Sequence, residues 1–163
     1  MRVLGLDPGT ATTGYGVVEQ RSSRLYHVTH GVITTPPHTP FEQRLTTIYD
    51  ETSALVAKYK PDAVGLEKIY FKQNVTTGIT VAQARGVLAL TAARAKLPIR
   101  ELSPAEVKTG VVGYGKATKR QVQEMVKVLL NLDALPKPDD AADALAIAIC
   151  TLHAGRLGDA IQA

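Results

Sequence analysis

The sequence contains little cysteine and few aromatic residues, and it has no long apolar run. Its 163 residues include one cysteine, Cys150, and no tryptophan. A single cysteine excludes an intrachain disulfide framework and a cysteine-based zinc site, and it is typical of a reducing cytosol. No apolar run reaches the ~18 residues that a membrane span needs, and Asp7 comes too early for a signal peptide. We therefore expect a cytoplasmic protein that makes no contact with a membrane.

Acidic residues are outnumbered by basic ones. The chain has 19 lysine and arginine residues against 15 aspartate and glutamate residues, which gives a formal net charge of +4. This excess favours a polyanionic partner and argues against a cationic substrate. The length suits one domain, because a chain of ~150 residues buries roughly 68–70% of its unfolded surface. We expect a single domain over residues 1–157 and a short flexible C-terminal tail over residues 158–163.

The pattern of apolar residues predicts an α/β fold. The predicted strands cover residues 1–6, 13–19, 25–35, 62–67 and 99–102, and the predicted helices cover residues 41–59, 77–97, 104–109, 118–130 and about 140–156. Short turns join the first three strands, which makes them antiparallel, whereas helical crossovers make the later strands parallel. We therefore predict a five-stranded mixed sheet flanked by helices.

Two acids follow apolar runs that predict buried strands. Asp7 comes directly after Val3–Leu6, and Glu67 comes directly after Ala63–Leu66. Open α/β sheets bind ligands at the carboxyl ends of their strands, so acids at two such ends would converge on one crevice. Taken singly, each acid could equally cap a turn or pair with a nearby lysine.

The last predicted helix begins with further acids. Asp140 and Asp143 are three residues apart and therefore lie on the same side of the helix. Capping of the helix N-terminus explains an acid at Asp139 or Asp140. It explains Asp143 less well, because the helix around this residue is apolar almost all round and should be buried.

Four carboxylates in one crevice need a counter-charge. Two carboxylates about 4 Å apart repel by roughly 4 kcal/mol at an effective dielectric constant of 20. Mg²⁺ prefers oxygen ligands, and two such ions about 3.5–4 Å apart can clamp the attacking and leaving oxygens of a phosphodiester displacement. The acids therefore predict a site for two divalent ions, if the fold brings them together.

The stretch from Gly110 to Ala117 comes close to the phosphate-binding loop G-x-x-x-x-G-K-[ST]. Ala117 stands where that motif needs a hydroxyl group for Mg²⁺. Residues 104–109 predict a helix, whereas the motif needs a preceding strand. Both observations argue against a nucleotide-binding loop.

Basic residues are concentrated between residues 108 and 130. This segment contains one acid, Glu124, and five basic residues, which are Lys108, Lys116, Lys119, Arg120 and Lys127. Basic residues at the start of a helix oppose its dipole, whereas a DNA phosphate backbone would attract them. An ordinary solvated helix face explains the same pattern equally well.

A second candidate for DNA contact follows Glu67 directly. Tyr70 and Phe71 are flanked by Lys68 and Lys72 in a predicted loop. Aromatic rings in such a loop can stack on an unpaired base. Alternatively, Ile69 and Phe71 pack on the sheet or on a partner subunit, and only Tyr70 is free.

Six short motifs resemble the RuvC family of bacterial Holliday-junction resolvases, in the order of that family. They are Gly5–Gly9, Gly14–Gly16, Leu66–Glu67, Gln83–Gly86, Val111–Gly113 and Asp140–Ala146. The resemblance implies a ribonuclease-H-like fold, a homodimer, and paired symmetric incision of a four-way DNA junction in homologous recombination and DNA repair. It also implies two Mg²⁺ or Mn²⁺ ions in each active site, and the RuvA–RuvB branch-migration complex as a further partner.

The same resemblance assigns roles to residues of this chain. It implies that the metal-binding catalytic acids are Asp7, Glu67, Asp140 and Asp143, and Asp139 has no counterpart in the motif. The family's stacking aromatic corresponds to Tyr70 or Phe71, and Tyr70 fits better by its spacing from Glu67. Lysines that matter for the family's activity correspond to Lys108 and Lys119. For DNA binding we expect contributions from Tyr70, Phe71, Lys72, Lys108, Lys116, Lys119 and Arg120.

Two other functions remain open from the residues alone. One is a ribonuclease-H-like nuclease that acts on RNA or on another branched DNA, and the other is a structure-selective DNA-binding protein without activity. Four carboxylates argue against the second, because a pure binder gains nothing from acids next to phosphate. If the chain forms a dimer, the alanine-rich helix predicted over residues 77–97 is our candidate for the interface.

Overall fold

A single mixed sheet forms the centre of the computed structural model, which describes residues 1–70 and 75–162, with side chains as far as residue 155. Its strands are β1 (Arg2–Asp7), β2 (Thr12–Arg21), β3 (Arg24–Thr34), β4 (Ala63–Glu67) and β5 (Ile99–Leu102). They lie in the order β3-β2-β1-β4-β5. The five-stranded mixed sheet that the sequence predicts is therefore confirmed.

The pairing of the strands explains how two acids reach one edge. Strands β1, β2 and β3 pair antiparallel, whereas β1 pairs with β4, and β4 with β5, in parallel. In the β1–β4 pair, Leu6 lies opposite Leu66. Asp7 and Glu67 are the next residues on these two strands, so both strands end on an acid at the same edge of the sheet.

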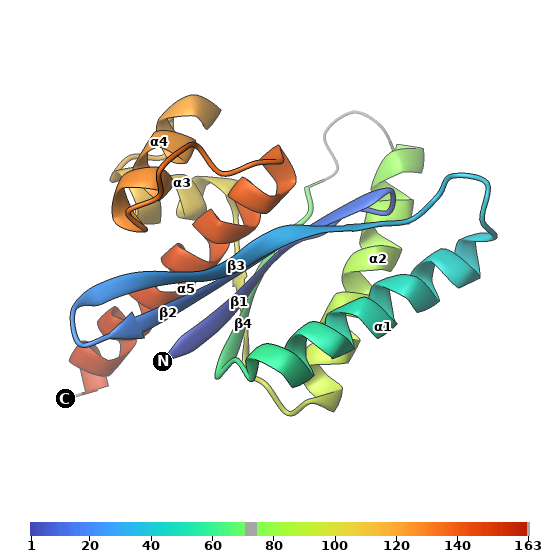
Figure 1. The fold of residues 1–163 in the computed structure, drawn as a ribbon, viewed down its shortest axis with the longest axis horizontal. Coiled ribbons are helices and arrows are strands. Elements are labelled where there is room, and N and C mark those ends of the chain that lie inside the picture. The colour runs from blue at the N-terminus through green and yellow to red at the C-terminus, as the bar shows by residue number, and fades with distance from the viewer. Residues whose placement is uncertain (71–74, 163) are drawn as a thin grey trace.

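Helices cover both faces of the sheet (Figure 1). They are α1 (Phe41–Tyr59), α2 (Val75–Arg94), α3 (Pro104–Val112), α4 (Lys119–Leu129) and α5 (Asp139–Gln162). Helices α1 and α2 pack on one face, and α5, backed by α3 and α4, packs on the other. Two apolar clusters result, one on each face, and the order of the ten elements is the predicted one.

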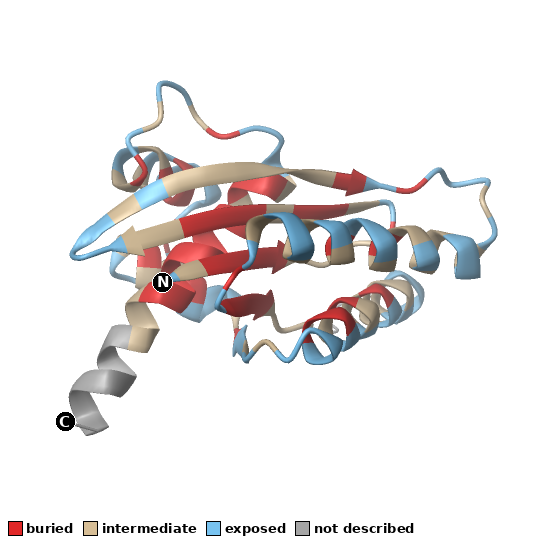
Figure 2. Cartoon of the chain, turned by 60° about the horizontal axis from the view of Figure 1, so that its bottom comes forward, coloured by how far each residue is buried: buried red, intermediate tan, exposed pale blue. Residues whose placement is uncertain are grey.

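Helix α5 is the most deeply buried helix among the described residues. Its residues from Ala141 to Leu152 are almost all buried, and Figure 2 shows this part between the sheet and the helices behind it. The backbone of α5 lies very close to the strands of the sheet. A methyl group on Gly14 would overlap the carbonyl oxygen of Asp140, and one on Gly5 would overlap that of Ala144. Glycine on β1 and β2 therefore lets the helix backbone lie directly on the strands.

Two helices extend further than the sequence predicts. Helix α3 continues to Val112, beyond the predicted end at Thr109, because Gly110 lets it pack tightly against Cys150 of α5. This helix covers the residues before Gly110, where the phosphate-binding loop needs a strand, so such a loop is ruled out. Helix α5 continues to Gln162, beyond the predicted end near Arg156. The proposed division into residues 1–157 and a tail of residues 158–163 stays a prediction.

No helix in the described part of the chain has both the length and the apolar character needed to cross a membrane.

Candidate active site

Three of the four predicted acids come together at the carboxyl end of β1. Asp7 ends β1, and Asp140 and Asp143 lie in the first turns of α5. One carboxylate oxygen from each of the three lies within 4.8 Å of the others, and all three side chains are partly buried. Gly14 lies opposite Asp7 on β2, and its missing side chain allows the first turn of α5 to reach this position.

Glu67 lies beside this cluster, at the end of the neighbouring strand β4. It lines a cavity of about 250 Å³ together with Asp143, Lys108 and Lys119. The site is therefore an acidic centre, Asp7, Asp140 and Asp143, with Glu67 beside it and two lysines at its rim.

Burial and mutual repulsion make the acids hard to ionise together. Burial, followed by the charges of Glu67, Asp143 and Asp140, raises the pKa of Asp7 to about 8. Burial and the charge of Asp143 raise the pKa of Glu67 to about 6. The pKa of Asp143 is also raised by its burial, although Lys119 opposes the shift. Such a set of acids favours a bound cation, because a divalent ion can replace the protons as counter-charge.

Lys119 is the cation that the fold places nearest to these acids. It is the first residue of α4, whose N-terminus is fixed by a reciprocal pair of hydrogen bonds between Thr118 and Gln121. Its Nζ lies 3.1 Å from Oδ2 of Asp143 and 3.6 Å from Oδ2 of Asp139. This explains why a lysine can stand at a helix start, since carboxylates of α5 offset the unfavourable dipole.

Asp139 lies outside the acidic centre. Its exposed carboxylate accepts a hydrogen bond from Gln123 and pairs with Lys119 and Lys137. The charge of Lys119 is the largest of the causes that lower the pKa of Asp139. Its surroundings therefore favour the ionised form without a metal, unlike those of Asp7.

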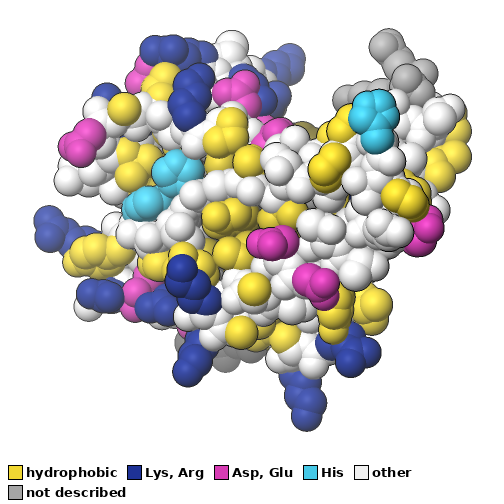
Figure 3. All heavy atoms as spheres, turned by 45° about the vertical axis from the view of Figure 1, so that its right-hand side comes forward, with side chains coloured by type: hydrophobic (Ala, Val, Ile, Leu, Met, Phe, Trp, Pro, Cys, Tyr) yellow, Lys and Arg dark blue, Asp and Glu magenta, His cyan; other side chains and the backbone are white. Residues whose placement is uncertain are grey.

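The remaining predicted DNA contacts differ in where they lie. Lys108 lines the cavity beside Glu67, whereas Lys116 is exposed in the loop before α4. Arg120 is exposed and pairs at 2.8 Å with Glu124 of its own helix. Basic side chains gather at the upper left of the face in Figure 3, on the side of α3 and α4.

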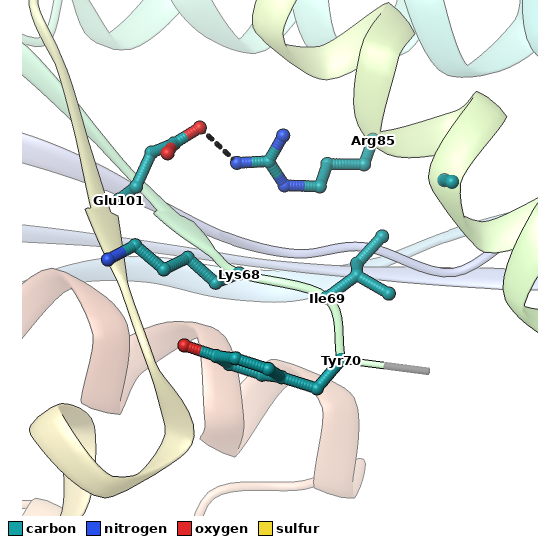
Figure 4. A pocket seen from close by; sticks show the side chains of 6 residues that line it. Lys68, Ile69, Tyr70, Arg85 and Glu101 are labelled. Atoms are coloured by element: carbon teal, nitrogen blue, oxygen red, sulfur yellow. Dashed lines mark hydrogen bonds and ion pairs between the residues drawn. The ribbon is translucent and has the colours of Figure 1, made fainter. Parts of the chain in front are cut away.

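Tyr70 shares a cavity with Glu67. Its side chain is 55% exposed and lines two adjoining cavities, one of about 320 Å³ with Arg85 and one of about 590 Å³ with Glu67. In Figure 4 the ring lies on the other side of Lys68 and Ile69 from Arg85. Phe71 and Lys72, the other predicted contacts in this loop, lie outside the described residues.

Arg85 contacts this site, although the sequence suggests no role for it. From α2, its Nε donates a hydrogen bond of 2.9 Å to the carbonyl oxygen of Glu67, and a terminal nitrogen pairs with Glu101 of β5 (Figure 4). Arg85 thus connects a helix and a strand to the backbone of a predicted metal ligand. Its only signal in the sequence is its place in the Gln83–Gly86 motif.

The sheet order, the flanking helices and the acids define an α/β protein of the ribonuclease-H-like class with a carboxylate site suited to divalent cations. Comparison with known proteins narrows this class to one family. The family described as "Crossover junction endodeoxyribonuclease RuvC" matches residues 3–151. The chain belongs to this family.

Individual relatives agree with this assignment over nearly the whole chain. The protein of that name from Syntrophomonas wolfei is 53% identical over 162 residues, which cover 99% of this chain and 94% of the relative. The one from Heliobacterium modesticaldum is 53% identical over 153 residues, which cover 94% of each chain. The structure of Thermus thermophilus RuvC in complex with a Holliday junction substrate superposes with a TM-score of 0.93 at 31% identity, covering 97% of this chain and 96% of the other.

Proposed function

We propose that this protein is a structure-selective endonuclease that resolves four-way DNA junctions by paired symmetric incisions. The observation that carries the proposal is the acidic centre of Asp7, Asp140 and Asp143, in a chain whose fold matches a RuvC solved with its junction substrate. Lysines at the rim of this centre suit a phosphodiester substrate. Four-way junction DNA is accordingly the proposed partner.

The acids fit divalent cations in their chemistry. Asp7, Asp140 and Asp143 offer carboxylate oxygens within 4.8 Å of one another, and Glu67 offers a further carboxylate at the adjoining cavity. Hard oxygen donors of this kind suit Mg²⁺, or Mn²⁺ as a substitute. We assign these four residues to two ions. When bound, such ions supply positive charge to the phosphodiester and lower the pKa of water.

The protein groups have separate tasks in this reaction. Asp7 lies at the centre of the site and must release its proton before it can act as a ligand. Lys119 pairs with Asp143, and it can turn to the scissile phosphate once cations occupy the acids. Lys108 lies at the same cavity and adds charge for the phosphate. Tyr70 offers an exposed ring that can stack on an unpaired base.

Paired incision requires two active sites, so we propose that the protein acts as a homodimer through α2. This helix leaves one side open to solvent, with Ile79 51% and Leu90 54% exposed. A methyl group on Gly86, on the same side, would meet nothing within 4 Å. An aliphatic side of this kind suits contact with a second copy. Sedimentation of the wild type should show a dimer, and Leu90→Glu should shift it to a monomer.

The RuvA–RuvB branch-migration complex is the further partner that we propose from membership of the family. Addition of that complex should change the rate of junction cleavage by this protein. Without the complex, cleavage should still occur, because both active sites of the dimer are present.

The decisive experiment compares a synthetic four-way junction with a linear duplex of matched sequence, each with and without Mg²⁺. We expect symmetric nicks on the junction alone and only with Mg²⁺. Asp7→Asn should bind the junction as the wild type does and cut it at least a hundredfold more slowly, since an amide cannot replace the carboxylate as a metal ligand. Equal cleavage of the linear duplex would contradict junction selectivity, and a wild type that binds without cutting would make the protein a binder only.

A further inference from the structure

Arg44 is a partly buried cation with no acidic partner in the part of the chain that the structure describes. Of the described arginine side chains that are not fully exposed, Arg2 pairs with Glu19 and Arg85 with Glu101. Arg44 has no carboxylate within 4.0 Å among the described residues. A guanidinium group that has lost part of its hydration needs an anion from elsewhere to compensate for the lost water. This makes Arg44 a candidate for binding a ligand.

The guanidinium group is held in place through one of its nitrogens. Nε of Arg44 donates a hydrogen bond of 2.8 Å to Oγ1 of Thr35, which in turn donates one of 2.6 Å to the carbonyl oxygen of Thr10. Thr35 is only 3% exposed, and its backbone N–H donates to the carbonyl oxygen of Ala11. Arg44 is thereby fixed to the turn between β1 and β2. Within the described residues its two terminal nitrogens make no hydrogen bond, so their donors are open to another group.

The turn and Arg44 line a cavity of about 410 Å³. Its other lining residues include Thr77 and Thr80 at the start of α2, and Arg44 is the single charged side chain among the described residues that line it. A neutral wall with hydroxyl groups and one arginine selects a small anion, because arginine matches phosphate oxygens with two parallel hydrogen bonds. None of the described residues that line the cavity is an acid that would repel such an anion.

We propose that this cavity binds a phosphodiester of the DNA backbone next to the phosphate that is cut. The inference rests on the proposed function, because the cleaved DNA supplies the phosphate. The lining turn begins two residues after Asp7, so a strand that passes the acidic centre must run close to it. Arg44 holds the strand in position there and takes no part in the bond cleavage.

The test measures junction binding by the full chain without divalent ions, so that no cleavage occurs, over a range of salt concentrations. Arg44→Gln should lower affinity about tenfold at low salt. It should also make the slope of log K against log[salt] shallower by about 0.9 for each phosphate that the protein no longer neutralises. Arg44→Lys keeps the charge and should keep most of the slope. If Arg44→Gln does not fold, Thr80→Glu, which places an acid at the cavity wall, should give the same two effects.

Arg24→Gln is the matched control. It removes the same charge from an exposed side chain at the first residue of β3, at the far end of β2 from the cavity, and should leave the slope unchanged. Equal effects of Arg24→Gln and Arg44→Gln would overturn the inference in favour of net charge alone. Unchanged slopes in Arg44→Gln and Thr80→Glu, both folded by circular dichroism, would also overturn it.

Two further measurements separate the possible sources of failure. Inorganic phosphate could raise the Tm of the wild type but not of Arg44→Gln, while both proteins show the same slope of log K against log[salt]. In that case the cavity binds a free anion, and the proposal that it binds DNA is wrong. Cleavage by the wild type with Mg²⁺ is measured in parallel. If the wild type cuts the junction and only the slope prediction fails, this inference falls and the proposed function stands.

Discussion

The two faces of the sheet are built in different ways, and both contribute to the site. On one face α5 lies with its backbone against glycines of β1 and β2, and its residues are buried by the sheet in front and by α3 and α4 behind. On the other face α1 and α2 pack through side chains such as Ile48 and Leu88, and each leaves one side in water.

This difference matches what each face provides. The α5 face contributes Asp140 and Asp143, which must meet Asp7 at fixed distances. The other face contributes arginines that reach the site from outside, namely Arg85 at the backbone of Glu67 and Arg44 at the turn after β1. Metal ligands require a backbone that cannot shift, whereas long side chains can hold a loop or a strand of DNA from a surface helix. Substitutions on the α5 face should therefore have the larger effects.

Gly14→Ala should have the largest effect. Its methyl group would overlap the carbonyl oxygen of Asp140, so the first turn of α5 must move away from Asp7. We expect a loss of ~3 kcal/mol in the free energy of unfolding, at the upper end for an overpacked site. Cleavage should fall at least about a hundredfold, as expected for a ~1 Å displacement of catalytic groups. Denaturant unfolding and junction cleavage measure the two effects.

Gly155→Ala on α5, the helix that Gly14 contacts, is the matched control. A methyl group at Gly155 would meet nothing within 4 Å, and alanine should stabilise the helix by about 0.5–1 kcal/mol. If Gly14→Ala is as well tolerated as Gly155→Ala, the close approach of α5 does not determine the position of its acids.

The pH dependence of the metal-free protein tests the acidic centre itself. Asp7 has a pKa of about 8 in the folded protein, against an ordinary value of 3.8. The folded state therefore keeps a proton that the unfolded state has lost, and the metal-free protein should lose stability as the pH rises from about 4 to about 8. Mg²⁺ must displace this proton, so its apparent affinity should rise by up to about tenfold per pH unit over the upper part of this range.

Thermal unfolding with and without Mg²⁺ at a series of pH values measures both trends. The increase in Tm caused by Mg²⁺ should grow from about pH 6, where Glu67 has ionised by half, to about pH 8, where Asp7 has done so. In Asp7→Asn the metal-free protein should be more stable than the wild type at the upper pH, and Mg²⁺ should add little. An increase in Tm that does not depend on pH would mean that the acids are ionised without the metal.

The sequence predicts the α5 face better than it predicts the other face. Acids that follow apolar runs, as Asp7 and Glu67 do, point to strand ends, and the spacing of Asp140 and Asp143 places them on one side of a helix. The prediction that these four acids lie together depends only on local pattern and on the parallel pairing of β1 with β4. The length of α3 was not predictable from its residues, because packing against Cys150 outweighs the low helix propensity of Gly110.

The roles of the arginines depend on distant parts of the chain. Arg85 lies 18 residues from the carbonyl group that it contacts, and no motif indicates a bond to a backbone oxygen. Likewise, the sequence cannot show that Arg44 has no carboxylate within 4.0 Å among the described residues, because this depends on where each acid lies in the fold. The role of Gly14 is likewise not predictable from the sequence. There it is only a motif residue, whereas the structure shows that it contacts α5.

Arg85→Gln should have a smaller effect than the changes on the α5 face. It removes the hydrogen bond to the carbonyl oxygen of Glu67 and the ion pair with Glu101. The end of β4 stays in the sheet, so the fold should remain, while the carboxylate of Glu67 becomes less well placed. We expect about a tenfold fall in kcat with little change in KM for the junction, and a higher Mg²⁺ concentration for half-maximal rate.

Glu101→Gln separates the two interactions of Arg85 and should have the smallest effect. Glu101 is half exposed, and such ion pairs contribute about 0–1 kcal/mol. The variant keeps the bond from Nε of Arg85 to Glu67, so kcat and the Mg²⁺ requirement should stay within about threefold of the wild type. If Glu101→Gln impairs cleavage as much as Arg85→Gln does, the ion pair across α2 and β5 positions the site, and the hydrogen bond to the Glu67 backbone is secondary. A larger fall in kcat in Arg85→Gln alone would establish that a surface helix places a metal ligand through its main chain.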